Sequence, residues 1–208
     1  MPKLGMEPLR KKALMDAALR AIGQNGSLNV TMSDIAREAG VSAALAHHYF
    51  GSKQQLLLET IRSLLRALRR DAITALGQAS GPRARLSAIV RVSFQSDQFT
   101  NETVAAWLAF YVEAQRSEEM RRLLIAYTRR LRSNIMDSLN RLCPPDDAAR
   151  IAEGAAALID GLYIRHSLQA APLGLSAAPA LVENYFDTQL KPFSDAPSRE
   201  GKPSIRIL

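Results

Sequence analysis

Apolar residues recur every three or four positions along nearly the whole chain, which is the period of an amphipathic helix. No run of β-branched residues alternates with polar residues for long enough to indicate a strand. Glycines, prolines and capping residues divide the pattern into segments of helical length. The sequence therefore predicts an all-α fold of about nine helices, over residues 8–22, 31–40, 42–50, 53–76, 82–94, 101–115, 117–142, 146–169 and 176–190.

Several of these segments carry signals for helix ends. Thr31 is placed to cap the second segment, Gly40 ends it, and Ser42 is placed to cap the third. Ser52 and Gln55 form a capping-box pattern in front of the long fourth segment. These signals sharpen the predicted boundaries where the apolar pattern alone would leave them loose.

Charge is distributed unevenly between the two halves of the chain. Residues 1–100 carry 14 Lys and Arg against 7 Asp and Glu, whereas residues 101–208 carry 13 of each. A basic module beside a neutral one favours a head that binds a polyanion and a body with another task. We predict a DNA-binding head over residues 1–52, a helical ligand-binding and dimerisation domain over 53–190, and a disordered tail over 191–208, which has three prolines and mixed charge.

Residues 31–50 have the spacing of two short helices joined by a tight turn, a helix-turn-helix. Ala36 is small where the second helix must approach closely, and Gly40 permits the positive φ that a tight turn requires. Such a motif places its second helix in the major groove of DNA, although short helix pairs also occur as plain structure. Four further residues are predicted to form the shared inner face: Ile35, Val41, Leu45 and Ala46.

The residues that follow place a phenol and a lysine, Tyr49 and Lys53, around the start of the next helix. Unpaired amides at a helix start attract anions, and a lysine adds a full positive charge. With these residues the chain resembles the TetR family of bacterial repressors, in which the helix-turn-helix ends in a tyrosine-phenylalanine pair followed by a lysine at this spacing. The resemblance covers residues 8–60 and extends more weakly over the whole length. It implies a DNA-binding head in front of a ligand-binding, dimerising domain.

The resemblance also implies roles for individual residues of the head. Base contacts specify the sequence and phosphate contacts position the protein. The two adjacent histidines diverge by about 100° on a helix and so cannot share one metal ion, and packing at the helix rim is an alternative for either. The residues expected to face the major groove are Ser42, Ala43, Ala44, His47 and His48, and those expected to contact phosphates are Thr31, Tyr49 and Lys53.

Three further segments, residues 1–6, 105–110 and 157–162, resemble the choline-responsive repressors of the glycine-betaine pathway within the TetR family. This closer resemblance spans both predicted domains. It implies that the protein represses genes of choline uptake and oxidation, and that choline relieves the repression.

The chain contains side chains suited to such a ligand. A quaternary ammonium cannot donate a hydrogen bond and is best held by aromatic faces, with a carboxylate to neutralise its charge. Aromatic residues at helical spacing are also typical of a protein core, and that alternative stays open. The residues expected to contact the ligand are Trp107, Phe110, Tyr111, Tyr127, Tyr163 and Asp160, with Glu113 as an alternative carboxylate.

The last two predicted helices carry a stripe of small and apolar residues. In the TetR family this helix pair docks against its copy, and a symmetric homodimer suits a palindromic operator. Packing within one chain would use the same stripe and is the alternative. Its members are Gly154, Ala155, Leu158, Leu162, Ala177, Leu181 and Tyr185.

Other classes of protein find little support. No apolar stretch approaches the ~20 residues of a bilayer crossing, and Asp16 interrupts any signal peptide, so we expect a soluble, cytoplasmic protein without membrane contact. Cys143 is the single cysteine and there are three histidines, which leaves little material for a disulfide scaffold or a metal site.

An enzyme is not favoured either, because there is no glycine-rich phosphate loop and no nucleophile elbow, and no cofactor is expected. Two alternatives remain. One is a TetR-type repressor of an efflux or lipid-metabolism operon that responds to another ligand, and the other is an architectural DNA-binding protein without a ligand.

Overall fold

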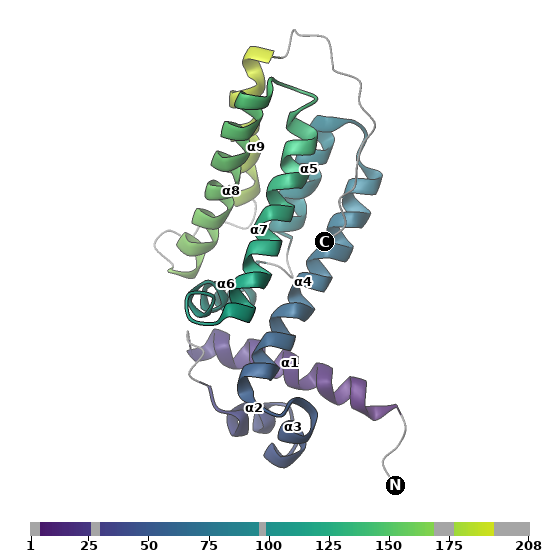
Figure 1. Cartoon of the computed structure of the whole chain (residues 1–208), viewed down its shortest axis with the longest axis vertical. Helices are drawn as coiled ribbons and strands as arrows, with labels where there is room; N and C mark the ends of the chain where they lie inside the picture. Colours follow the sequence, from purple (N-terminus) through teal and green to yellow (C-terminus); the bar gives the residue numbers. More distant parts are fainter. Residues whose placement is uncertain (1–4, 26–29, 96–98, 169–176, 194–208) are drawn as a thin grey trace. The chain divides into compact units, whose positions relative to one another are not determined.

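The computed structural model describes residues 5–25, 30–95, 99–168 and 177–193, and in these residues the chain forms helices and no strand (Figure 1). The predicted all-α class is therefore confirmed. In chain order the helices are α1 (Met6–Asn25), α2 (Met32–Glu38), α3 (Ala43–Phe50), α4 (Lys53–Gln78), α5 (Pro82–Ser93), α6 (Asn101–Glu113), α7 (Glu118–Leu139), α8 (Pro145–Ser167), α9 (Ala177–Leu190) and a 3₁₀ turn, η1 (Lys191–Phe193).

The chain forms two compact units. Unit 1 comprises Met1–Leu65 with Asn101–Leu124, and unit 2 comprises Arg66–Thr100 with Ile125–Leu208, so that α4 and α7 each contribute to both. The functional boundaries expected after residues 52 and 190 stay predictions. The first three residues of the expected tail form η1, and residues 194–208 lie outside the described part of the chain.

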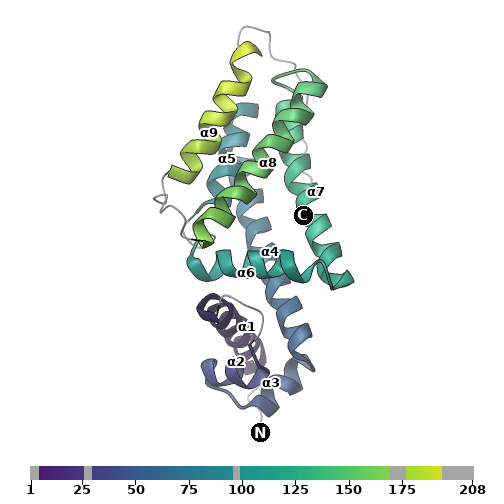
Figure 2. The ribbon, with the colours of Figure 1, turned by 90° about the vertical axis from the view of Figure 1, so that its left-hand side faces the viewer.

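In unit 1, α1 packs against α2 and α6 (Figure 2). Its buried stripe consists largely of alanine, which lets the neighbouring helices approach closely. The closest approach is at Gly23, where a Cβ atom would lie 2.8 Å from the Cα of Glu102 at the start of α6. Glycine is therefore required there by space rather than by backbone conformation.

The helix-turn-helix forms as the sequence predicts. The Thr31 hydroxyl oxygen accepts a hydrogen bond from the Asp34 amide, and the Asp34 carboxylate accepts one from the Thr31 amide, a complete capping box. Gly40 adopts a φ of 67°, and the amide of Val41 donates back to the Ala36 carbonyl over 2.9 Å. On the inner face Ile35, Ala36 and Ala46 are buried, and Val41 and Leu45 are half-buried.

The start of α4 is also capped as expected, because the Ser52 hydroxyl oxygen accepts a hydrogen bond from the Gln55 amide over 3.2 Å. From Lys53 the helix continues without interruption to Gln78. One continuous helix therefore begins in unit 1 and ends in unit 2.

In unit 2, α9 packs against α8 and α5, and both views show α8 and α9 side by side (Figures 1 and 2). Arg83 on α5 donates to the carboxylates of Glu183 and Asp187 on α9, over 2.6 Å in each case. Arg150 on α8 donates to the side chain of Gln189 on α9 over 2.6 Å. Polar contacts thus fix α9 along both of its neighbours.

A buried cation holds α5 to its other neighbours. Arg85 is 4% exposed. Its guanidinium donates to the backbone carbonyl of Leu76 on α4 over 3.2 Å and to the carboxylate of Asp137 on α7 over 3.3 Å. One side chain therefore connects the C-terminal part of α4 with α5 and α7.

Candidate functional site

The residues expected to contact DNA lie on or beside α3. Ala44, His47 and His48 are exposed on that helix, and Ala43 is half-buried. The Nδ1 atom of His47 lies 3.0 Å from the Gly51 carbonyl, which orients its ring at the end of the helix. The exposed side of α3 therefore carries alanine methyl groups and imidazole rings, which are short side chains that can contact base edges in the major groove.

Two of the expected contacts already have local roles. The Thr31 hydroxyl donates to the Asp34 carboxylate over 2.6 Å, and this bond is the main reason that the pKa of Asp34 lies below its usual range. The Ser42 hydroxyl oxygen accepts from the Leu45 amide over 3.2 Å. A hydroxyl has one proton, and this bond leaves the proton of Ser42 available, whereas Thr31 already donates its proton to Asp34.

Tyr49 and Lys53 are half-buried near the start of α4. The Nζ atom of Lys11 on α1 lies 5.8 Å from the centroid of the Tyr49 ring and 2.7 Å from a carboxylate oxygen of Glu7. The Lys11 ammonium lowers the pKa of Glu7 through this contact. Lys11 is a basic residue beside the helix-turn-helix that was not among the expected contacts, and its place in the basic run 10–12 was the available signal.

The positive charge is less concentrated in the head than the two halves of the sequence indicated. Residues 1–53 contain seven Lys and Arg and four Asp and Glu, so they carry +3 of the +7. The four acidic residues all form exposed ion pairs, which contribute little to stability and can be exchanged for phosphates. The rest of the excess lies in the arginines of α4 and α5.

Three of the expected ligand residues gather on α6 in unit 1. Trp107 and Phe110 are buried and Tyr111 is half-buried. The centroid of the indole ring lies 5.8 Å from that of Phe110 and 6.2 Å from that of Tyr111. The predicted helical spacing thus brings the three rings together on one face.

The other three gather in unit 2. Tyr127 on α7 is half-buried, and the loss of water around its phenol raises its pKa. Tyr163 and Asp160 on α8 lie close enough to raise it further. Tyr127 is therefore an un-ionised phenol beside a carboxylate. Whether one ligand touches this group together with Trp107, Phe110 and Tyr111 stays a prediction.

Tyr163 belongs to an aromatic cluster that the sequence did not predict. Its hydroxyl donates to the Ser93 carbonyl. Its ring centroid lies 5.8 Å from that of Phe94 and 5.1 Å from that of Phe99, and the Phe99 ring lies 4.2 Å from that of His166. Phe94 and Phe99 follow α5 and belong to no helical stripe, so no periodic signal could have found them.

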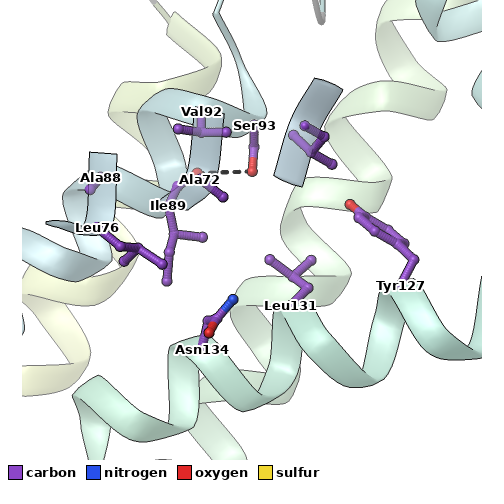
Figure 3. Close-up of a pocket in the computed structure, with 10 residues that line it drawn as sticks. Ala72, Leu76, Ala88, Ile89, Val92, Ser93, Tyr127, Leu131 and Asn134 are labelled. Atoms are coloured by element: carbon purple, nitrogen blue, oxygen red, sulfur yellow. Dashed lines mark hydrogen bonds between the residues drawn. The ribbon is translucent and has the colours of Figure 1, made fainter. Parts of the chain in front are cut away.

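Tyr127 also lines a small cavity between α4, α5 and α7 (Figure 3). The cavity has a volume of about 40 Å³ and is largely apolar. Its polar side chains are those of Tyr127, Ser93 and Asn134. The remaining lining residues are Leu68, Ala72, Leu76, Ala88, Ile89, Val92 and Leu131.

The stripe expected to form a dimer interface is partly used within the chain. Ala155 and Leu162 are buried. The Tyr185 hydroxyl donates to the Ile151 carbonyl over 3.4 Å and covers Gly154. Leu181 on α9 and Ile164 on α8 remain 43% and 42% exposed. Intramolecular packing therefore takes part of the stripe, and the homodimer stays a prediction.

Metal binding and membrane crossing were assessed for the described residues alone. These residues contain no group of three or more His, Cys, Asp or Glu side chains that could hold a metal ion. Within the same ranges, no helix combines the length and apolar character needed to cross a membrane.

Comparison with known proteins extends over the whole chain. Residues 14–60 match the family described as bacterial regulatory proteins, tetR family, and residues 82–191 match the C-terminal domain of the BetI-type transcriptional repressors. Over 208 residues, all of both chains, the protein is 83% identical to the HTH-type transcriptional regulator BetI of Agrobacterium fabrum. It is 66% identical over the same length to BetI of Rhizobium meliloti.

Solved structures share the fold. A transcriptional regulator from Pseudomonas aeruginosa superposes with a TM-score of 0.74 at 26% identity, over 88% of this chain and 91% of its own. One from Saccharomonospora viridis, solved in complex with choline, superposes with a TM-score of 0.74 at 23% identity, over 85% and 95%. The resemblance found in the sequence is confirmed: the chain belongs to the BetI-type transcriptional regulators of the TetR family.

Proposed function

We propose that this regulator represses genes of choline uptake and of choline conversion to glycine betaine, and that choline relieves the repression. The observation that carries the proposal is the 83% identity with a BetI regulator over the full length of both chains. A structural neighbour with the same fold was solved in complex with choline. The grouping of Asp160 with Tyr127 and Tyr163 supplies the chemistry that such a cation needs.

On DNA, the regulator acts as a homodimer in the cytoplasm. A palindromic operator offers two equivalent half-sites, which a two-fold symmetric dimer can occupy together. In each half-site, Ser42, Ala43, Ala44, His47 and His48 face the bases of the major groove. Thr31, Tyr49 and Lys53 contact phosphates, and Lys11 supports them through its contact with Tyr49.

In unit 2, the carboxylate of Asp160 balances the positive charge of choline. The phenol rings of Tyr127 and Tyr163 present π-faces, which attract a cation that cannot be hydrogen-bonded. Burial raises the pKa of Tyr127, so that this phenol stays neutral beside Asp160. Within unit 1, Trp107, Phe110 and Tyr111 on α6 are the remaining residues that we propose as ligand contacts.

The connection between ligand and DNA runs through α4. This helix begins at Lys53, a proposed phosphate contact, and its later residues Leu68, Ala72 and Leu76 line the cavity beside Tyr127. A ligand changes the DNA affinity only if it binds the DNA-competent and incompetent forms unequally. We propose that choline favours a position of α4 that no longer fits the operator.

The experiment is a fluorescence anisotropy titration of the purified protein on DNA from its own upstream region. Choline is added to the complex, with glycine betaine as the control. We expect tight binding that choline weakens. Tight binding that is indifferent to choline would retain the DNA-binding regulator and contradict the proposed ligand, leaving an efflux or lipid-metabolism repressor.

The Trp107→Leu variant tests the α6 group in the same assay. Leucine keeps the position apolar but is smaller than tryptophan and has no π-face, so a thermal unfolding scan accompanies the titration to show that the variant is folded. We expect the variant to bind the operator as the wild type does and to respond to choline only at a higher concentration. An unchanged response would remove Trp107 from the ligand site.

A further inference from the structure

The first turns of α1 carry an ion pair on the face of the helix that is directed toward the rest of unit 1. At spacings of four and three residues, Glu7 and Lys11 continue the stripe in which Leu14 and Ala18 are buried. The two side chains meet on this face, with the Nζ atom of Lys11 2.7 Å from a carboxylate oxygen of Glu7. The pair therefore extends the packed face of α1 as a charged one.

This ion pair lies beside the C-terminal end of α3. The Nζ atom of Lys11 is 5.8 Å from the centroid of the Tyr49 ring, and that ring is 5.6 Å from the imidazole of His48. The hydrogen bond from Lys11 is the main reason that the pKa of Glu7 is lowered, and His48 is close enough to lower it further. The Glu7 carboxylate therefore lies near an ammonium and an imidazole, which are groups that bind phosphates in protein–DNA complexes.

We propose that the Glu7 carboxylate occupies the place of a DNA phosphate in the free protein, and that a phosphate of the operator displaces it from Lys11. This inference rests on the proposed function, in which Tyr49 contacts the DNA backbone. A phosphate held by the Tyr49 hydroxyl comes close to the Lys11 ammonium, which already lies against the same ring. Lys11 is then a phosphate contact in its own right, and Glu7 competes with DNA for it.

The exposure of the pair permits this exchange. The Glu7 side chain is 58% exposed, so a DNA backbone can reach the contact. An exposed ion pair contributes little to stability, and a phosphate diester offers the ammonium the same single negative charge as a carboxylate. After the exchange, the carboxylate remains near the phosphate without its cation, and the two like charges repel each other. Glu7 therefore weakens the binding of DNA.

A second ion pair of α1 provides matched controls for the test. Lys12 and Asp16 also lie four residues apart, with 2.5 Å between the Nζ and Oδ2 atoms, and Lys12 follows Lys11 by about 100° around the helix. The variants are Glu7→Gln and Lys11→Met, with Asp16→Asn and Lys12→Met as controls that change the net charge equally. Fluorescence anisotropy measures the affinity of each full-length protein for the operator and for a scrambled duplex at several salt concentrations.

We expect Glu7→Gln to bind both duplexes more tightly, by about twofold to fivefold per half-site, which is the usual effect of one exposed ion pair. Both duplexes respond because backbone phosphates carry no sequence information. Lys11→Met should weaken binding by a similar factor and reduce the slope of log affinity against log salt by about one per half-site. Asp16→Asn and Lys12→Met should have clearly smaller effects, because salt screens charges that do not contact a phosphate.

The double variant Glu7→Gln with Lys11→Met separates competition for the ammonium from packing against Tyr49. If the Lys11 stem acted only by packing, Lys11→Met would weaken DNA binding by the same factor with or without Glu7. Under the proposal the factor is larger in the Glu7→Gln background, because there the ammonium reaches the phosphate without a competitor. Thermal unfolding midpoints should stay within about 2 °C of the wild type, because an exposed ion pair adds little stability.

The possible outcomes distinguish this inference from the proposed function. Equal responses of the two ion pairs would overturn the inference alone, because only the net charge of α1 would then matter. A loss in Lys11→Met that is the same in both backgrounds would overturn it too, and so would a gain in Glu7→Gln that is confined to the operator, because such a gain indicates a base contact. Absence of operator binding by the wild type would overturn the proposed function, and the inference with it.

Discussion

The buried guanidinium of Arg85 gives the most direct prediction from the structure. Replacing it by methionine keeps most of the packing volume and removes the positive charge. The Asp137 carboxylate, whose side chain is 18% exposed, then loses the cation 3.3 Å away, and the Leu76 carbonyl loses a donor. Both acceptors lie where water replaces a lost partner poorly, so the unfolding free energy must fall.

The size of the loss follows from the burial. Removing one member of a buried ion pair costs about 3–5 kcal/mol. Because Asp137 keeps some contact with water and the bond is long, we expect the lower end, about 3 kcal/mol. For a chain of this length that corresponds to a fall of about 6–12 °C in the unfolding temperature.

Thermal and urea unfolding of Arg85→Met measure this loss, and Arg132→Met is the matched control. Arg132 lies on α7, the helix of Asp137, but its Nε atom is 3.9 Å from the Glu153 carboxylate and the two side chains are 50% and 78% exposed. We expect the control to lose less than about 1 kcal/mol. The double variant Arg85→Met with Asp137→Asn should recover much of the loss, because the carboxylate charge is removed together with the cation that faced it. Equal losses in Arg85→Met and Arg132→Met would refute the reasoning.

Three further predictions concern unit 1. Lys53→Ala should weaken binding equally for all operator sequences and reduce the slope of log affinity against log salt by about one per half-site. Anisotropy titrations at several salt concentrations measure this slope. A changed sequence preference with an unchanged slope would contradict the phosphate contact. Thr31→Val should cost about 1 kcal/mol at neutral pH. The pKa of Asp34 is lower in the folded than in the unfolded protein, so its bonds to Thr31 stabilise the fold above the unfolded pKa. This stabilisation is lost as the pH falls through the folded pKa. Between pH 7 and pH 3, the unfolding temperature should therefore fall less in the variant than in the wild type. Gly23→Ala should cost about 1–3 kcal/mol, because its Cβ would meet the backbone of Glu102, and an unchanged unfolding temperature would argue against that close approach.

Local features of the sequence predicted the elements of the fold well. The helix-turn-helix is an example, because a capping box at Thr31 and a positive φ at Gly40 depend on residues only a few positions apart. The α6 group is another, because i, i+3 and i+4 spacing places Trp107, Phe110 and Tyr111 on one face whatever the rest of the chain does. The helix-turn-helix also carries the resemblance to the TetR family, which the comparisons confirm.

The composition of the ligand site was predictable only in part. Tyr127, Asp160 and Tyr163 were expected from residue chemistry, and the structure groups them. Phe94 and Phe99 were missed, because their contacts with Tyr163 join positions more than sixty residues apart, and no local pattern records such a pairing.

The helical class, the turn at Gly40 and the type of chemistry on each helix were predictable, because they follow from short-range sterics and hydrogen bonding. Which polar groups lose their water became evident from the packing of the helices. Arg85 and Asn134 look like ordinary helix-surface residues in the sequence, yet packing buries both. The physical reason is that desolvation depends on neighbours from distant helices, and it is desolvation that makes a charge or a carboxamide costly to leave unpaired.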